Sequence, residues 1–176
     1  MMKCPLCNCD NLPGADTCSS CQADLADPNG PQLAVDLLAD LTTGKLSTLI
    51  PKTPMEVDPS TPVRQVVQQL AKGGRKCALI VKDGRMQGIF TERDILQKVA
   101  LEYDRVADNP VSTFMTPNPE SLSREDTIAF GLNRMTAGGY RHLPIVEQDR
   151  PLGVVSVRDV MSYLAKRYPD ELGTRT

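Results

Sequence analysis

The stretch Gly88-Ile-Phe-Thr-Glu-Arg-Asp94 has a second version later in the chain, Gly153-Val-Val-Ser-Val-Arg-Asp159. Both belong to a longer internal repeat, in which residues 49–99 align without a gap with residues 114–164, at an offset of 65 positions. A repeat of this kind predicts two copies of one supersecondary unit, each covering the apolar face of the other. A site built in one copy is therefore expected to have a counterpart in the other.

Each copy is predicted to fold as a β-α-β-β-α unit with a small mixed sheet, which makes the chain an α/β (α+β) protein. In the first copy, Ser60-Thr61-Pro62 cap a helix with apolar residues on one face, and Gly73-Gly74 end it. An apolar strand over residues 77–81 follows, and after a turn a second strand runs to Phe90 and leads into a helix from Glu92. The second copy has the same signals in the same order: Asp126-Thr127, Gly138-Gly139, a strand over 143–146, a strand to Val155 and a helix from Val157.

At each predicted strand-to-helix junction, a hydroxyl residue precedes an aspartate by three positions (Thr91 and Asp94; Ser156 and Asp159). In a single occurrence this spacing is typical of a capping box, in which the hydroxyl and the carboxylate cap the helix start. Three features favour a binding site in addition. Both copies have the pattern, both place an arginine directly before the aspartate, and both have a glycine where a ligand could approach the backbone.

The chemistry of these residues suits a nucleotide. A hydroxyl and free amides at a helix N-terminus can hold a phosphate. An aspartate one turn further on can accept hydrogen bonds from two vicinal ribose hydroxyls, as acidic residues do in other nucleotide sites. The neighbouring Arg93 and Arg158 supply positive charge for the phosphates.

With these motifs, the sequence resembles a tandem pair of CBS domains, the Bateman module, over about residues 46–166. The matching motifs are Gly-x-x-[Ser/Thr]-x-Arg-Asp in both copies, Gly139-Tyr-Arg-His-Leu-Pro144-Ile-Val, and Met115-Thr-Pro-Asn-Pro119. The resemblance implies a pseudo-twofold pair of repeats with two clefts that bind adenosine nucleotides or related adenosyl ligands. Such modules commonly dimerise into a flat disc and regulate an attached or partner protein.

The resemblance also implies roles for individual residues. The aspartates would hold the ribose (Asp94, Asp159), and the hydroxyl residues would lie near the ribose and phosphate (Thr91, Ser156). The first copy has Ala78-Leu79 where the family usually has Leu-Pro, so it departs from the pattern at its adenine end. The residues expected at the adenine ends and along the phosphate path are Thr53, Pro54, Arg75, Lys76, Cys77, Arg93, Asn118, Pro119, Tyr140, Arg141, His142, Pro144 and Arg158.

Two Cys-x2-Cys pairs near the N-terminus predict a closed structural zinc site of four thiolates. Two disulfides or loose thiols are the alternative. The segment resembles the zinc-ribbon family, with Asn8 and Gln22 in place of the family's glycines, and Cys9 is interpreted as a packing residue rather than an alternative ligand. The predicted metal ligands are Cys4, Cys7, Cys18 and Cys21.

The composition and the sequence motifs limit the classes of function that the chain can have. With 176 residues and 40% apolar residues the chain can bury a core, and its net charge of −2 gives no basic surface for nucleic acid or anionic membranes. The N-terminus lacks the apolar region of a signal peptide, which indicates the cytoplasm. His142 is the only histidine, and no motif places a nucleophile beside it, so the chain is not expected to be an enzyme.

The predicted organisation is a zinc ribbon (1–25), a linker with a short amphipathic helix over 32–41 that Gly44 ends (26–45), the two repeats (46–104 and 105–167) and a polar tail (168–176). We predict a regulatory homodimer that senses an adenosine nucleotide and contacts a protein partner through the ribbon. Two alternatives remain. One is a nucleic-acid-binding protein that uses the ribbon, which the acidity of that segment disfavours. The other is a dimerisation scaffold without ligand.

Overall fold

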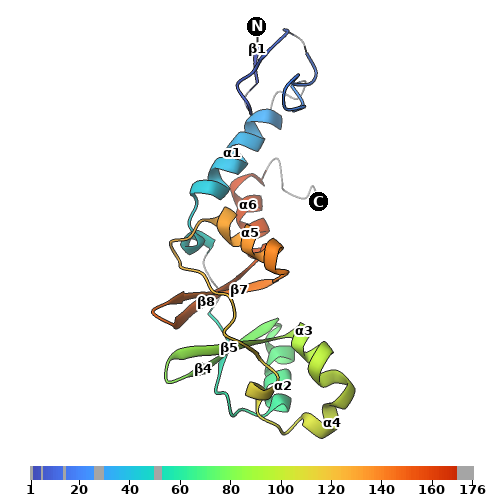
Figure 1. The fold of residues 1–176 in the computed structure, drawn as a ribbon, viewed down its shortest axis with the longest axis vertical. Coiled ribbons are helices and arrows are strands. Elements are labelled where there is room, and N and C mark those ends of the chain that lie inside the picture. Colours follow the sequence, from blue (N-terminus) through green and yellow to red (C-terminus); the bar gives the residue numbers. More distant parts are fainter. Residues whose placement is uncertain (1, 5, 14, 26–29, 50–52, 170–176) are drawn as a thin grey trace. The chain divides into compact units, whose positions relative to one another are not determined.

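The computed structural model describes residues 2–4, 6–13, 15–25, 30–49 and 53–169 (Figure 1). Residues 26–29 of the predicted linker lie outside the described residues, and so does most of the polar tail. The chain forms two units, Met1–Gly44 with Thr127–Phe130, and Lys45–Asp126 with Gly131–Thr176. Among the described helices, none has the length and apolar character needed to cross a membrane.

The first unit contains a two-stranded antiparallel sheet and one helix. Strand β1 (Met2–Lys3) pairs with β2 (Asp10–Asn11). Helix α1 (Gly30–Thr43) includes the helix predicted over 32–41 and begins two residues earlier. The backbone N–H of Gly44 donates to the Asp40 carbonyl at 2.9 Å, so this glycine directly follows the last helical residue, as predicted.

The first copy of the repeat has the predicted mixed sheet, in the order β3-β4-β5-β6. Strand β3 (Glu56–Val57) runs parallel to β4 (Cys77–Lys82), which pairs antiparallel with β5 (Arg85–Thr91). Helix α2 (Val63–Gly73) connects β3 to β4 and ends at Gly74 in the left-handed conformation. The fourth strand, β6 (Thr116–Pro117), comes from the segment that leads into the second copy.

The second copy reproduces the hairpin of the first in its hydrogen-bond register, but not the mixed sheet predicted for it: among the described residues its sheet contains only β7 and β8, with a single parallel bridge between Leu122 and Ile145. Helix α5 (Ile128–Gly138) precedes the hairpin of β7 (His142–Glu147) and β8 (Arg150–Ser156). Cys77 opposite Thr91 in the first hairpin corresponds to His142 opposite Ser156 in the second. Each hairpin has its register shift at the same place, between Ile80 and Val81 or between Ile145 and Val146. The predicted repeat is therefore confirmed at the level of single residue pairs.

The segments after the two hairpins differ. The second copy continues as one helix, α6 (Val157–Arg167). In the first copy the helix begins at the predicted residue but changes its hydrogen bonding every few residues (Figure 1). The successive pieces are α3 (Glu92–Asp94), the π-helical η2 (Ile95–Val99), the 3-10 helix η3 (Ala100–Glu102) and α4 (Tyr103–Val106).

The segments that precede the copies are exchanged between them. The 3-10 helix η4 (Val111–Thr113) leads into the second copy, but its Val111 amide donates to the Thr61 carbonyl of the first copy at 2.8 Å. In the same way η1 (Leu46–Leu49) leads into the first copy, and its Leu46 amide donates to the Asp126 carbonyl at 2.8 Å. Each copy is thus completed by residues that belong, in sequence order, to the other.

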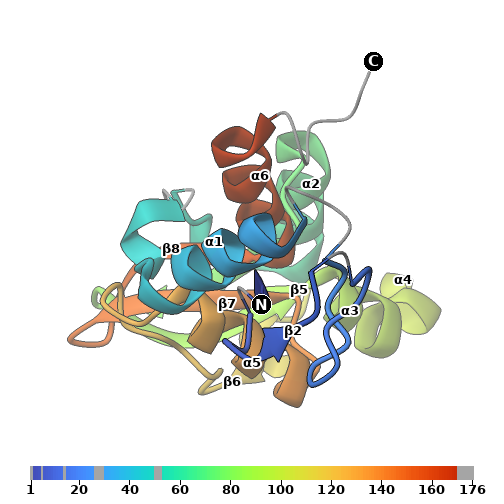
Figure 2. The same ribbon diagram turned by 90° about the horizontal axis from the view of Figure 1, so that it is seen from above.

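The first-copy sheet is buried on both faces. Helix α2 covers one face of the β4–β5 hairpin, where Ala78, Ile80 and Phe90 pack with residues of α2 such as Val66 (Figures 1 and 2). On the other face Cys77, Leu79 and Ile89 pack against Val154 of the second copy. The loss of water contact on this second face favours the pairing of the two copies, whereas the first face forms a core within the first copy.

Candidate functional site

A cavity of about 850 Å³ lies in the second unit, between residues of both copies. Its size is within the range of small-molecule sites in proteins. Its polar lining comes from the segment before β3, the end of α2, the start of β4, the start of β7 and the junction between β8 and α6. The lining residues are Thr53, Pro54, Met55, Gly73, Gly74, Arg75, Lys76, Cys77, Glu92, Arg141, His142, Val154, Ser156, Val157, Arg158 and Asp159.

The predicted junction of the second copy lies in this cavity. Ser156 and Asp159 form a capping box, in which the serine amide donates to the Asp159 Oδ2 at 2.8 Å. The Ser156 hydroxyl donates to the same oxygen at 2.5 Å. The cap and the site therefore use the same side chains, because the box fixes the carboxylate at the helix start, where it lines the cavity.

The first copy contributes the other side of the cavity. Arg75 donates from Nη1 to the Thr53 carbonyl at 3.4 Å, which joins the two first-copy segments that were predicted to line an adenine end. Lys76 Nζ and Glu92 Oε1 form an ion pair at 2.7 Å. Burial raises the pKa of the Cys77 thiol to about 11, so this side chain is neutral at physiological pH.

The charges that line the cavity favour an anion. The positively charged residues outnumber the two carboxylates of Glu92 and Asp159, and burial lowers the pKa of His142, which keeps its imidazole neutral near pH 7. Arginine and lysine side chains around an open cavity are typical of phosphate recognition. The positively charged residues in the lining are Arg75, Lys76, Arg141 and Arg158.

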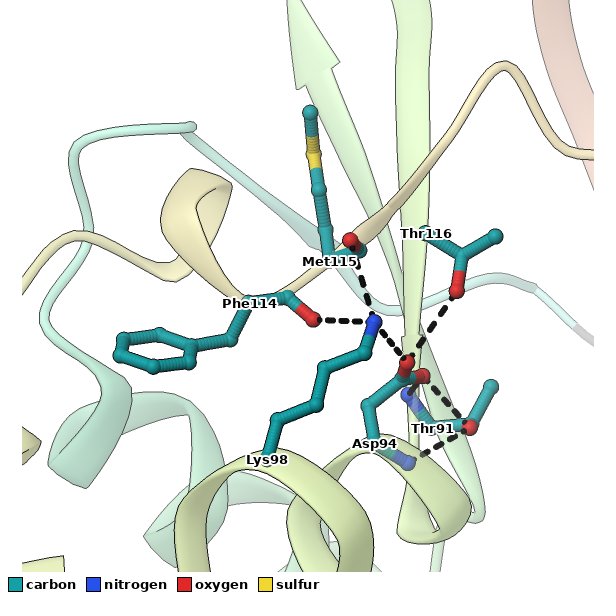
Figure 3. A network of polar contacts seen from close by, with 6 residues as sticks. All are labelled: Thr91, Asp94, Lys98, Phe114, Met115 and Thr116. Atoms are coloured by element: carbon teal, nitrogen blue, oxygen red, sulfur yellow. Dashed lines mark hydrogen bonds and ion pairs between the residues drawn. The ribbon is translucent and has the colours of Figure 1, made fainter. Parts of the chain in front are cut away.

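The first-copy junction has the same capping box but a different environment (Figure 3). The Thr91 amide and hydroxyl donate to Asp94 Oδ2 at 2.9 and 2.7 Å. Lys98 Nζ donates to Asp94 Oδ1 at 2.7 Å, and the Thr116 hydroxyl donates to the same oxygen at 3.1 Å. Burial alone would raise the pKa of Asp94, but the hydrogen bonds from Lys98 and Thr91 outweigh it and lower the pKa.

Two residues of this junction, Gly88 and Arg93, contact other parts of the chain. Gly88 was expected to leave room for a ligand, but the chain itself takes that space, because a Cβ there would lie 2.5 Å from Met115 Sδ and 2.9 Å from the Thr116 carbonyl oxygen. Arg93 was expected to serve the phosphates, but its Nη1 donates to the Gly139 carbonyl at 3.3 Å. Both contacts tie the first junction to other parts of the protein.

The predicted residues therefore divide into two groups. The cavity brings together ten of them from both copies, and the remaining seven do not line it. Those in the cavity are Thr53, Pro54, Arg75, Lys76, Cys77, Arg141, His142, Ser156, Arg158 and Asp159. Those outside its lining are Thr91, Arg93, Asp94, Asn118, Pro119, Tyr140 and Pro144.

Sequence reasoning missed several cavity residues. Glu92 is the first residue of α3, and the repeat pairs it with Val157, which also lines the cavity. The alignment of the copies could have identified both positions, since they directly follow the hydroxyl residues of the two junctions. Met55 and Val154 carry no polar group, and nothing in the sequence alone marks them as cavity residues.

The comparison with known proteins now decides the family. The family model of the CBS domain matches residues 47–101 and 111–166. The chain belongs to the CBS-domain family. It is 32% identical over 134 residues to the CBS domain-containing protein CBSCBSPB1 of Arabidopsis thaliana, a match that covers 74% of this chain and 24% of the relative. The chain thus spans about a quarter of that curated relative.

Solved CBS-domain structures have the same fold. One from Agrobacterium tumefaciens is 27% identical, with a TM-score of 0.63 over 68% of this chain and 98% of that one. One from Pyrobaculum aerophilum, solved with AMP, is 23% identical, with a TM-score of 0.60 over 69% and 98%. The CBS domain pair of protein MJ0100, solved with 5′-methylthioadenosine and S-adenosyl-L-methionine, is 19% identical, with a TM-score of 0.63 over 71% and 98%.

Outside the CBS repeats, the four predicted cysteine ligands form one cluster. Their sulfur atoms all lie within 4.8 Å of one another. Cys4 Sγ lies 3.6 Å from Cys21 Sγ, and Cys7 Sγ lies 3.5 Å from Cys18 Sγ, distances far too long for disulfide bonds of about 2.05 Å. Four sulfurs at this spacing match a tetrahedral centre with Zn–S bonds of about 2.3 Å.

The backbone around the cluster is shaped for metal binding. Asn8 and Gln22, which replace the glycines of the zinc-ribbon pattern, both adopt the left-handed conformation, with φ of 60° and 63°. Their amides donate to the carbonyls of Cys4 and Cys18 at 2.8 and 3.0 Å, so the two knuckles have the same turn. A hydrogen bond from the Cys21 amide lowers the pKa of the Cys18 thiol to about 5, while the neighbouring sulfurs raise the pKa of the Cys21 thiol to about 12.

Asn11 supports the cluster, and no sequence motif predicts this role. This buried side chain donates from Nδ2 to the Cys9 carbonyl at 3.0 Å and to Cys18 Sγ at 3.6 Å. Its Oδ1 accepts hydrogen bonds from the Ser19 amide and hydroxyl at 2.9 and 3.1 Å. Such outer contacts orient metal ligands. Cys9 itself is half-buried, and its Sγ lies 3.9 Å from Cys18 Sγ.

Proposed function

We propose that this chain is a regulatory module that binds an adenosine nucleotide or a related adenosyl ligand at Asp159 and acts on a partner protein. The observation that carries the proposal is the 850 Å³ cavity, where Ser156 and Asp159 of one CBS repeat face cationic residues of both. An acidic residue for the ribose and a cationic rim for phosphates are the two elements that a nucleotide needs. The CBS structures solved with AMP or S-adenosyl-L-methionine support the adenosyl part of the ligand.

In this proposal each group has a chemical task. The Asp159 carboxylate accepts hydrogen bonds from the ribose hydroxyls, and Ser156 keeps it in place through the capping box. Arg141 and Arg158 take the phosphates. His142 stays neutral and half-buried, so it serves as a contact to the base and not as a proton donor. No group is assigned a catalytic task.

The test is the thermal stability of the zinc-loaded protein with AMP, ADP, ATP, S-adenosyl-L-methionine or GTP. A ligand at about 100 times its Kd adds roughly 2.7 kcal/mol, which raises Tm by several degrees at this size. We expect the shift with adenosyl ligands only, and we expect Asp159→Ala to abolish it.

Asp94→Ala is the matched control, because it removes the same capping box from the other CBS repeat. Both variants lose a helix cap, so a loss of ligand response in Asp159→Ala alone separates binding from stability. If no ligand shifts the Tm of the wild-type protein, or if GTP acts as strongly as the adenosyl ligands, the proposed function is wrong.

We also propose that the cysteine cluster holds one structural zinc ion. Four thiolates leave no open position for a reacting group, so the ion would stabilise the fold of residues 2–25 and do no chemistry there. Elemental analysis of the purified protein should find one zinc per chain in the wild type and in Cys9→Ser, and a loss in Cys18→Ser. Retention of full zinc by Cys18→Ser would contradict this assignment.

The regulatory part of the proposal includes a homodimer. Leu96 and Met161 occupy equivalent positions in the two CBS repeats and are 71% and 54% exposed. Equivalent apolar side chains on a pseudo-twofold pair form a surface that a second copy can cover with its own. We expect sedimentation to show a dimer that Leu96→Glu weakens and that Leu12→Glu, a change at an exposed residue near the cysteines, leaves intact.

A further inference from the structure

We propose that Lys98 is a built-in cation that closes the Asp94 site, so that each chain binds one nucleotide, at Asp159. The inference rests on the function proposed for the Asp159 cavity and assigns opposite roles to two equivalent aspartates. One CBS repeat would sense the ligand, while its copy uses the same carboxylate as a fixed structural contact.

The first reason is the number of hydrogen bonds that Asp94 already accepts. A carboxylate has about four acceptor positions. Thr91 fills two of them on Oδ2, and Lys98 and Thr116 fill two on Oδ1 (Figure 3). The Asp94 side chain is only 8% exposed. A ribose could approach this carboxylate only by displacing donors that belong to the protein.

The second reason is that Lys98 is itself held on several sides. Its ammonium has three N–H donors. They reach Asp94 Oδ1 at 2.7 Å, the Phe114 carbonyl at 2.9 Å and the Met115 carbonyl at 3.4 Å (Figure 3). Phe114 and Met115 directly precede β6, which pairs with β5. The cation is therefore fixed between the helix and the sheet, and its three donors are all used.

The third reason is the chemistry of the competition. The Lys98 ammonium and the Asp94 carboxylate form a hydrogen-bonded ion pair at 2.7 Å. Ribose hydroxyls carry no charge. If they displaced Lys98 they would leave its ammonium without a counter-charge, which costs free energy, so ligand binding at Asp94 is disfavoured.

The second CBS repeat has a different residue at the position that corresponds to Lys98. Tyr163 stands there, and its side chain has no positive charge. The lysine lies in the π-helical η2, whereas α6 continues through Tyr163 as an ordinary α-helix. A π-turn in a helix frequently marks a functional position.

The experiment is equilibrium dialysis of the full chain against radiolabelled AMP, repeated with ATP. Four proteins are compared: wild type, Asp94→Ala, Lys98→Tyr and Lys98→Tyr/Asp94→Ala. Lys98→Tyr gives the first repeat the residue of the second. We expect one nucleotide per chain for the wild type, and an affinity that Asp94→Ala changes less than threefold. Lys98→Tyr should bind a second nucleotide, which the double variant loses.

The outcomes separate the two proposals. A Lys98→Tyr variant that binds no additional nucleotide overturns the role of Lys98, and so does a wild-type affinity that falls more than tenfold in Asp94→Ala. If the wild type binds nothing but Lys98→Tyr binds one nucleotide through Asp94, the role of Lys98 stands and the proposed function of the Asp159 cavity fails. Circular dichroism of each variant establishes that it is folded.

Discussion

The two CBS repeats use the same seven-residue junction in different surroundings. In the second, Ser156 and Asp159 cap a continuous helix and line a large cavity. In the first, Thr91 and Asp94 form the same capping box, but the Asp94 carboxylate also accepts hydrogen bonds from Lys98 and from Thr116 of β6. The comparison teaches that a repeat conserves backbone register more strictly than it conserves the use of a side chain.

The first prediction compares the loss of stability when equivalent core residues of the two repeats are truncated. Phe90 and Val155 occupy the same position in the two hairpins, and both are buried, at 0% and 1% exposure. Phe90→Ala removes far more volume and should lower the free energy of unfolding by about 3–5 kcal/mol. Val155→Ala should cost about 2 kcal/mol, because only two carbon atoms are lost. Urea denaturation measures both.

Equal costs for the two truncations would mean that the loss of stability does not follow the apolar volume removed. Phe90→Leu is the control, since it preserves most of the apolar volume and should cost much less than Phe90→Ala.

The second prediction compares the two aspartates in the absence of ligand. Asp94→Ala should lower the free energy of unfolding by about 2–3 kcal/mol, since it removes a cap and leaves Lys98 without its counter-charge. Because Lys98 is 39% exposed, the cost stays below that of breaking a fully buried ion pair. Asp159→Ala removes the equivalent cap of α6, which contributes about 1 kcal/mol.

The pH dependence of this stability difference tests whether the charge of Asp94 causes it. The pKa of Asp94 is lowered in the folded protein, so its stabilising contribution is present above the unfolded pKa of about 4 and is lost as the pH falls through the folded pKa. The difference between wild type and Asp94→Ala should therefore be constant at neutral pH and shrink in acid. A difference that persists at low pH would assign the effect to packing instead.

The third prediction concerns a feature that the repeats share. Gly74 and Gly139 end α2 and α5 with φ of 59° and 64°, and an added Cβ would meet no atom within 4 Å at either residue. The cost of an alanine there is backbone strain alone, about 1–2 kcal/mol per residue. Gly74→Ala and Gly139→Ala should therefore give equal losses of stability in urea denaturation. Unequal losses would show that the two helix ends differ in the solution structure.

Much of this fold could be predicted from the sequence because the decisive signals are local. The glycines that end the helices, the alternation of the hairpins and the Ser/Thr-x-x-Asp caps all act within a few residues. The internal repeat then predicted the second copy as well, because it has the same signals in the same order. The cysteine spacing predicted the sulfur cluster for the same reason, since two tight turns present all four thiols.

The parts that could not be predicted depend on contacts between distant residues. The carbonyls that hold Lys98 belong to Phe114 and Met115, which are 16 and 17 positions away. The exchange of η1 and η4 between the repeats depends on contacts between distant residues, and no local sequence pattern predicts it. Asp94 was therefore assigned to a ligand on the strength of its motif, although its neighbours in space determine whether the carboxylate is available.

The smallest predicted effect concerns His142 and Cys77, which are equivalent residues at the start of β7 and β4. Burial lowers the pKa of His142 in the folded protein, so the unfolded chain binds more protons as the pH falls below about 6.5. The free energy of unfolding therefore decreases as the pH drops through that range. Wild-type stability should therefore decrease from pH 7.5 to 5.5 relative to His142→Gln. Cys77→Ala is the control: the pKa of this thiol is raised to about 11, so the cost of its removal should not change over the same range. Parallel pH profiles for wild type and His142→Gln would mean that the imidazole is as well solvated in the folded protein as in the unfolded chain, and the base contact proposed for it would lose its support.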